Sequence, residues 1–265
     1  MEVIDQKENR INALFKKNKK GLLSVYYTAG FPMRDDTVRI GKLLEASGAD
    51  ILEIGVPFSD PVADGSVIQA SNKAALDNGM TLRLLLDQVS ELRNRVKAPI
   101  ILMGYFNPIF QFGVKAFCEA AAAAGVDGLI IPDLPLLEYQ EMYKTTFEAN
   151  GLQNIFLISP TTSEERIRTI DSVSEGFIYA VSSSSTTGAK KDFSKEQRSY
   201  FERLQKMKLK NPLLIGFGVS NHKTFTVVCK YSAGAIVGSA FISMLKESEN
   251  MEEDIPEFVK ALKNN

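Results

Sequence analysis

Two observations predict that this chain has an α/β fold built from repeated strand and helix units. Short apolar runs alternate along the sequence with amphipathic helical patterns, which is typical of consecutive βα units. Eight such runs occur within 265 residues, and no linker rich in Pro or Ser divides them. Eight βα units favour a closed parallel barrel over an open doubly wound sheet. We therefore expect residues 1–265 to form a single (β/α)8 TIM barrel, as one domain.

The predicted strands are short runs of mainly aliphatic and aromatic side chains, the composition of strands that are buried on both faces. Because a helical pattern follows each run, neighbouring strands are expected to lie parallel. In chain order the strands are Leu22 to Tyr27, Ile51 to Ile54, Ile100 to Met103, Gly128 to Ile131, Ile155 to Ile158, Phe177 to Val181, Leu213 to Ile215 and Ala235 to Val237.

Helical patterns fill the segments between these strands. The run Phe117 to Ala124 is a strong helix former and ends at Gly125, a residue that favours helix termination. Thr81 is a possible N-cap for another helix. The apolar face of that helix contains Leu82, Leu85, Leu86, Val89 and Leu92.

Two further features support the barrel. A weak internal repeat, Ser47-Gly48-Ala49-Asp50 and Ala124-Gly125-Val126-Asp127, ends a helix and opens a strand in two different units. Before the first strand, apolar residues predict an extra N-terminal helix that closes the bottom of the barrel. They are Ile4, Ile11, Leu14 and Phe15.

Composition excludes several classes of protein. With 45% hydrophobic and 24% charged residues the chain can bury a full core, and its net charge of -1 argues against nucleic-acid or anionic-membrane binding. Cys118 and Cys229 are too few for a disulfide framework or a cysteine zinc site. The first residues lack a signal sequence, and no apolar run reaches membrane-spanning length, so a cytoplasmic protein is expected.

Glu53 is the most informative single residue, because it places an ionisable carboxyl group inside an apolar strand. A partly desolvated Glu has a raised pKa and can act as a general acid or base near neutral pH. Alternatively, Glu53 could belong to a structural ion pair or cap a backbone amide. The loop that follows adds Asp60 and Asp64 near the carboxyl end of the strand, where barrel enzymes place their chemistry.

Other strand ends predict a phosphate site. Gly216-Phe217-Gly218 and Gly238-Ser239 follow the last two strands, the usual phosphate-binding corner of this fold. The hydroxyl-rich segment Ser182 to Gly188 suits a lid or an anion contact. His222, the only histidine, is expected at an exposed helix start, which leaves almost no material for a histidine metal site or a catalytic triad.

Six motifs, in order along nearly the whole chain, resemble the tryptophan synthase alpha chain family. They are Glu53-Ile54-Gly55-Val56-Pro57-Phe58-Ser59-Asp60-Pro61 with Ala63-Asp64-Gly65, Met103-Gly104-Tyr105-Phe106-Asn107-Pro108, Pro132-Asp133-Leu134-Pro135, Thr186-Thr187-Gly188, Gly216-Phe217-Gly218 and Gly238-Ser239. The resemblance implies retro-aldol cleavage of indole-3-glycerol phosphate to indole and glyceraldehyde 3-phosphate without a cofactor. It also implies a beta-chain partner, which carries pyridoxal phosphate, in an alpha2-beta2 assembly.

The resemblance assigns residues to roles. Glu53 and Asp64 match the two catalytic carboxylates, and Tyr179 matches a tyrosine beside them. The residues expected to wall the indole are Tyr26, Leu102, Leu129 and Phe217; those expected at the phosphate are Thr187, Gly188, Gly218, Gly238 and Ser239. The residues expected to form an exposed rim that contacts the beta chain are Pro57, Phe58, Asp60, Asn107 and Pro108. The lid departs from the family pattern, with Ser183 and Ser185 where arginine and glycine are common.

Two other functions stay open from the residues alone. The first is a different phosphosugar isomerase or aldolase on the same fold. The absence of a lysine at any predicted strand end weighs against Schiff-base chemistry, which borohydride trapping would expose. The second is a non-catalytic barrel that only binds and activates a partner, although such a protein has little need for both Glu53 and Asp64.

Overall fold

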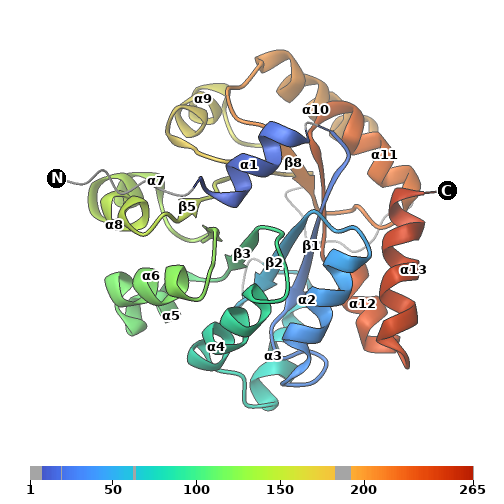
Figure 1. Cartoon of the computed structure of the whole chain (residues 1–265). Helices are drawn as coiled ribbons and strands as arrows, with labels where there is room; N and C mark the ends of the chain where they lie inside the picture. Colours follow the sequence, from blue (N-terminus) through green and yellow to red (C-terminus); the bar gives the residue numbers. More distant parts are fainter. Residues whose placement is uncertain (1–7, 19, 62–63, 183–191, 265) are drawn as a thin grey trace.

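A computed structural model describes residues 8–18, 20–61, 64–182 and 192–264. Its strands form one parallel sheet in the order β5-β4-β3-β2-β1-β9-β8-β7-β6, and helices surround the sheet (Figure 1). The strands are β1 Leu22–Thr28, β2 Ile51–Gly55, β3 Ile100–Met103, β4 Gly128–Ile130, β5 Gln153–Asn154, β6 Leu157–Ile158, β7 Ile178–Val181, β8 Leu213–Gly216 and β9 Gly234–Val237. The predicted barrel is thereby confirmed.

Helices follow the strands along the chain, as βα units require. They are α1 Arg10–Lys17, α2 Asp36–Ala46, α3 Ser66–Asp77, α4 Leu82–Arg93, α5 Phe106–Phe112, α6 Val114–Ala123, α7 Leu136–Glu138, the π-helix η1 Tyr139–Tyr143, α8 Lys144–Ala149, α9 Glu164–Val173, α10 Lys195–Met207, α11 His222–Tyr231, α12 Ser239–Glu247 and α13 Met251–Lys263. None of the helices in the described part of the chain has the length and hydropathy that a membrane crossing requires.

The fifth strand differs from its prediction. Instead of one strand from Ile155 to Ile158, two short pieces bind different neighbours: β5 pairs with β4, and β6 pairs with β7. Between the pieces, the Ile155 N–H donates to the Leu129 carbonyl at 2.8 Å, and the Tyr179 N–H donates to the Phe156 carbonyl at 2.9 Å. The chain thus changes partner within this segment and closes the barrel.

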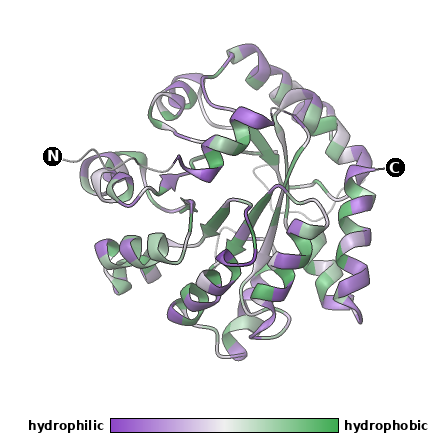
Figure 2. Ribbon diagram, in the orientation of Figure 1, coloured by the Kyte–Doolittle hydropathy of each residue, from purple (hydrophilic) through white to green (hydrophobic). Residues whose placement is uncertain are grey.

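The sheet separates two apolar clusters. In Figure 2 hydrophobic residues are frequent in the strands, whereas the outer helices carry both hydrophobic and hydrophilic residues. A large cluster fills the space between sheet and helices. A smaller one fills the barrel interior, with one or two inward side chains from almost every strand. It contains Leu22, Ile51, Ile101, Ile130, Ile155, Phe177, Tyr179, Leu214, Ala233, Ile236 and, from α1, Ile11. Ile11 is fully buried, so α1 seals the bottom of the barrel as predicted, whereas Ile4 lies outside the described residues.

The predicted internal repeat has a structural cause. Gly48 and Gly125 both have positive φ, which ends the preceding helix and turns the chain toward the sheet. Asp50 then accepts a hydrogen bond from the Leu23 N–H of the neighbouring strand at 2.9 Å. Asp127 accepts the equivalent bond from the Ile100 N–H, also at 2.9 Å. The same aspartate therefore ties adjacent strands together in two units.

Most local predictions are confirmed, with one correction. Thr81 caps α4 by accepting from the Leu84 N–H at 3.2 Å. Cys118 and Cys229 are free thiols. His222, expected to be exposed, is half-buried, and its Nδ1 lies 3.0 Å from the Leu262 carbonyl of α13. The start of α11 packs against the last helix, which the sequence around His222 did not indicate.

We expect Ile11→Ala to lower the free energy of unfolding by about 2–5 kcal/mol, since it opens a cavity at the sealed end of the barrel. Urea unfolding followed by circular dichroism measures this loss. The control is Leu137→Ala, which truncates a side chain that is 64% exposed and should change stability by less than about 0.5 kcal/mol. Equal losses in both variants would contradict the sealing role of Ile11.

Candidate active site

Glu53 lies in β2 with its side chain inside the barrel. The strand register sets Glu53 beside Tyr26 of β1 and Ile101 of β3. The side chain is completely buried and has only one long hydrogen bond, from the Ser24 hydroxyl to Oε2 at 3.5 Å. Oε1 has no partner among the described residues. The structure therefore gives no support to the ion-pair or capping explanation of this residue.

Burial has a direct electrostatic consequence for Glu53. Desolvation raises its pKa from the usual 4.5 to about 8, and the Ser24 hydrogen bond acts in the opposite direction. At neutral pH the folded protein therefore favours the protonated carboxylic acid. A buried acid that holds a proton at pH 7 is suited to proton donation.

Asp64 lies in the loop between β2 and α3. Desolvation raises its pKa from 3.8 to about 6, and a hydrogen bond from the Tyr105 hydroxyl to Oδ2 at 3.4 Å opposes the shift. Its main chain is held on both sides: the Asp64 N–H donates to the Pro61 carbonyl at 3.0 Å, and the Asp64 carbonyl accepts from Gln69 Nε2 at 2.9 Å. Asp64 is therefore ionised at neutral pH, in contrast to Glu53.

Tyr26 and Tyr179 connect the two carboxyl groups. Both are buried, and desolvation followed by the charges of Glu53 and Asp64 raises the pKa of each hydroxyl, so all four side chains share one electrostatic environment. The Tyr26 ring lies against Gly55, where any Cβ would stand 2.1 Å from the Tyr26 hydroxyl oxygen. Glycine is required at that position so that the aromatic ring can lie over the end of β2.

The ends of β8 and β9 meet beside these side chains. Gly218 has a φ of 80°, a conformation that other residues adopt only with strain. Gly238 precedes α12, whose first amides have no partner within the helix. A Cβ on Gly238 would contact the Tyr26 ring at 3.5 Å, which places this helix start near the two carboxyl groups. Thr187 and Gly188 lie outside the described residues.

The structure corrects the expected indole wall. Leu102 and Leu129 belong to the outer cluster, between sheet and helices, and are each 1% exposed. Side chains alternate along a strand, so their neighbours Met103 and Ile130 contribute to the barrel interior instead. Phe217 packs partly buried against the same interior cluster, with its ring centroid 6.3 Å from that of Tyr179.

The expected rim needs a second correction. Pro57 and Phe58 are half-buried rather than exposed, because the Phe58 ring stacks on Tyr105 with centroids 5.1 Å apart. Asp60 and Asn107 are exposed, and Pro108 is half-buried. The loop after β2 therefore packs partly on the segment after β3, and this contact also brings Tyr105 to Asp64.

Sequence reasoning missed three residues of the site: Ser24, Tyr105 and Asn72. Asn72 of α3 is 2% exposed, lines a narrow cavity together with Asp64 and Tyr105, and has no partner for Oδ1 within the described ranges. A signal for it existed, because Asn72 occupies an apolar face of α3 between Ile68 and Ala75. A polar residue at such a position needs a partner or a ligand.

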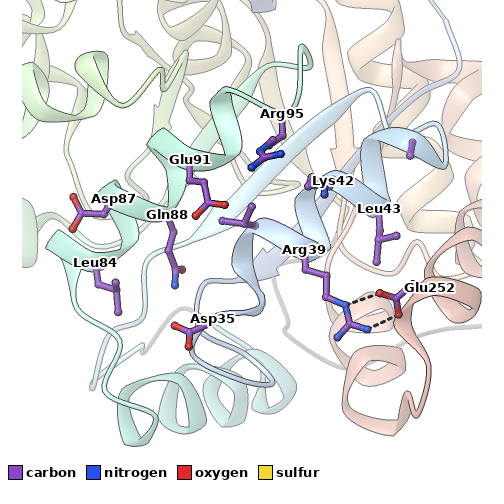
Figure 3. A pocket seen from close by; sticks show the side chains of 12 residues that line it. Asp35, Arg39, Lys42, Leu43, Leu84, Asp87, Gln88, Glu91, Arg95 and Glu252 are labelled. Carbon is purple, nitrogen blue, oxygen red and sulfur yellow. Dashed lines mark hydrogen bonds and ion pairs between the residues drawn. The ribbon is translucent and has the colours of Figure 1, made fainter.

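A larger groove on the outside of the barrel lacks these features. It runs between α2 and α4, and Glu252 of α13 forms an ion pair with Arg39 at its edge (Figure 3). Its remaining charged side chains have both signs and lie on α2 and α4 or next to the ends of these helices. Within the described chain no group of three or more His, Cys, Asp or Glu side chains could hold a metal ion.

Fold and site together define a class: a (β/α)8-barrel enzyme with two carboxyl groups at and after the end of the second strand and glycines after the last two strands. The model of one family, described as tryptophan synthase alpha chain, matches residues 12–265. The chain belongs to the tryptophan synthase alpha chain family.

Similar proteins agree with this assignment. The tryptophan synthase alpha chain of Flavobacterium johnsoniae is 54% identical over 255 residues, covering 96% of this chain and all of the relative. That of Bacteroides thetaiotaomicron is 49% identical over 255 residues, with 96% and 100% coverage. The crystal structure of tryptophan synthase subunit alpha from Legionella pneumophila matches with a TM-score of 0.88 and 34% identity, covering 97% of this chain and 98% of that one.

We expect Glu53→Gln to stabilise the protein above neutral pH. Since the folded-state pKa is raised from 4.5 to about 8, the native state binds the extra proton between these values, and wild type loses stability as pH rises through this window. Melting temperatures of variant and wild type should be similar near pH 5 and differ most near pH 9, with the variant higher. The exposed Glu91→Gln is the control; a pH-independent difference for Glu53→Gln would contradict this account.

Proposed function

We propose that Glu53 and Asp64 carry out the reaction of this family in this chain. That reaction is the retro-aldol cleavage of indole-3-glycerol phosphate to indole and glyceraldehyde 3-phosphate, which makes the protein a carbon-carbon lyase. The observation that carries the proposal is the opposite protonation of the two groups at neutral pH. The pKa of Glu53 is near 8 and that of Asp64 near 6, so one is an acid while the other is an anion.

Glu53 performs the proton transfers. Cleavage of the bond between indole C3 and the glycerol chain requires a proton on C3, which turns the ring into an electron sink. The protonated Glu53 carboxyl donates that proton, and the resulting carboxylate removes the proton of the adjacent glycerol hydroxyl as the aldehyde forms. Glu53 is then protonated again, so the cycle needs no other acid, and the reaction as written needs no cofactor in this chain.

Asp64 supplies charge stabilisation. As a carboxylate it accepts the indole N–H and stabilises the positive charge that grows on the protonated ring. The Tyr105 hydrogen bond at 3.4 Å keeps Asp64 oriented while leaving it partly desolvated. Tyr179, buried beside Glu53, excludes water from the reacting atoms.

The phosphate and the indole of the substrate bind to different residues of the site. The phosphate is bound by the amides of Gly218, Gly238 and Ser239, together with Thr187 and Gly188 of the segment outside the described residues. The indole lies among Tyr26, Phe217, Met103 and Ile130. Tyr26 and Met103 line the cavity beside Asp64, and Met103 and Ile130 replace the leucines expected from sequence.

The partner is the tryptophan synthase beta chain, in an alpha2-beta2 assembly, and pyridoxal phosphate belongs to that chain. We assign the contact to the rim around Pro57, Phe58, Asp60, Asn107 and Pro108. Because Phe58 stacks on Tyr105, and Tyr105 contacts Asp64, a partner that presses on this rim orders the catalytic carboxylate. A cytoplasmic location and one domain over residues 1–265 complete the proposal.

We expect Glu53→Gln and Asp64→Asn each to lower kcat for indole release by about 10²-fold or more, because each removes a group that acts in the transition state. The assay follows indole formation from indole-3-glycerol phosphate, with circular dichroism to show that each variant is folded. Near-normal turnover in either folded variant would refute the assignment.

The pH dependence separates the two roles. In wild type, kcat/KM should rise near pH 6 as Asp64 ionises and fall near pH 8 as Glu53 loses its proton. The substrate phosphate also titrates near pH 6. The pH profile of the residual activity of Asp64→Asn therefore shows which group causes the rise in kcat/KM near pH 6. The variant keeps this rise only if the substrate phosphate causes it.

We expect Asn107→Asp to reduce stimulation by the beta chain more than it reduces the basal rate, because Asn107 is exposed on the rim. In wild type, stimulation should exceed about tenfold through positioning and exclusion of water. Titration of beta chain against indole release measures both. Asn94→Asp, the same change at the exposed C-terminal end of α4, is the control and should retain full stimulation. Equal stimulation of Asn107→Asp and wild type would refute the rim contact.

A further inference from the structure

Phe217 stands out because its backbone is strained. It has a φ of 66°, and the other described non-glycine residue with positive φ, Lys208, is an ordinary helix C-cap. Such strain persists at functional sites where the surroundings hold the residue in place. Phe217 lies between the end of β8 and Gly218, so its conformation decides where both the ring and the next amide point.

A hydrogen bond from a neighbouring strand holds this strained residue. The Ser182 hydroxyl, at the end of β7, donates to the Phe217 carbonyl at 2.5 Å, and the Ser182 N–H donates to the Gly216 carbonyl at 3.0 Å. Ser182 is 1% exposed, so these bonds are shielded from water. The Ser182 hydroxyl also lies 3.7 Å from where a Cβ of Gly218 would stand.

Gln197 of α10 in turn orients Ser182. Its Nε2 donates to the Ser182 carbonyl at 3.1 Å and to the Ser182 hydroxyl oxygen at 3.3 Å, while its Oε1 accepts from the Ser194 N–H at 3.0 Å. A carbonyl can only accept and an N–H can only donate, so these contacts allow one orientation of the amide. Gln197 is 9% exposed.

The capping box of α10 explains only some of the hydrogen bonds of Gln197. Ser194 and Gln197 cap this helix reciprocally, and a glutamate at the same position would serve the cap equally well. Only an amide, however, can also donate to the two oxygen acceptors of Ser182. The choice of glutamine is therefore set by Ser182, and through it by Phe217.

We propose that Gln197 is a positioning residue that acts through Ser182 to hold Phe217 and Gly218 in the shape that binds substrate. The inference rests on the proposed function, since it assumes that the end of β8 contacts indole-3-glycerol phosphate. Gln197 itself touches no reacting atom. Its effect on the reaction is carried through Ser182, whose hydroxyl joins the end of β7 to the main chain after β8.

The test is Gln197→Glu, which keeps the helix cap but turns an oxygen toward the Ser182 carbonyl. We expect KM for indole-3-glycerol phosphate to rise about tenfold, more than kcat falls, with an unchanged melting temperature. Gln205→Glu is the matched control: the same change in the same helix, at an exposed residue whose Nε2 donates to the Lys230 carbonyl, should leave KM unaltered. A lower melting temperature with unchanged KM would show that Gln197 acts only as a helix cap, and would overturn the proposal.

A second variant keeps the proposal testable if Gln197→Glu folds poorly. Ser182→Ala removes the hydroxyl between Gln197 and Phe217, and should raise KM similarly; the double variant should then be no worse than the stronger single one. Additive effects would overturn the proposed series of contacts from Gln197 through Ser182 to Phe217.

Calorimetric binding of glycerol 3-phosphate measures ligand binding without turnover. Wild type that releases no indole would refute the proposed function itself, whereas active wild type with an unaltered Gln197→Glu refutes only this inference.

Discussion

The candidate active site depends on the carboxyl group of Glu53, which is uncharged at neutral pH and lies inside a closed apolar barrel. Glu53 lies on the interior face of β2, and among the described residues it has no ion-pair partner and one long hydrogen bond, so its charged form is disfavoured. The surrounding features follow from that placement. Tyr26 and Tyr179 are near enough for the charge of Glu53 to raise their pKa, and Gly55 is needed where the Tyr26 ring crosses the strand. The site keeps its proton at neutral pH because the barrel excludes water from it.

The two ends of the barrel have different roles. The bottom contributes packing and ion pairs, and the top contains the residues of the proposed reaction. At the bottom, Ile11 fills the interior, and Asp127 pairs with Arg10 at 2.9 Å while holding the Ile100 N–H. Both oxygens of the Asp127 carboxylate are therefore bonded. At the top, Glu53 and Asn72 each have a buried oxygen with no hydrogen-bond partner among the described residues. Incomplete hydrogen bonding at the top costs stability and leaves acceptors free for a ligand.

Two side chains link the loops around the pocket to one another. Tyr105, which follows β3, contacts the loop after β2 twice, by stacking on Phe58 and by a hydrogen bond to Asp64, and Ser182 joins the ends of β7 and β8. Each link runs from one βα unit to another, so the loops cannot be adjusted independently. A closed parallel sheet makes this possible, because it brings the carboxyl ends of all its strands to one face.

The sequence by itself determined the barrel, the buried Glu53, the Asp64 loop and the glycines of the last two strands, because apolar periodicity and long motifs are local signals. Only the tertiary structure decided which neighbours face inward. Leu102 and Leu129 were placed in the pocket, yet Met103 and Ile130 face the interior, since a shift of one residue reverses the side of a strand and these runs are apolar on both faces. Phe58 stacking, the divided fifth strand and the Gln197 contacts likewise depend on partners distant in sequence, which no local pattern encodes.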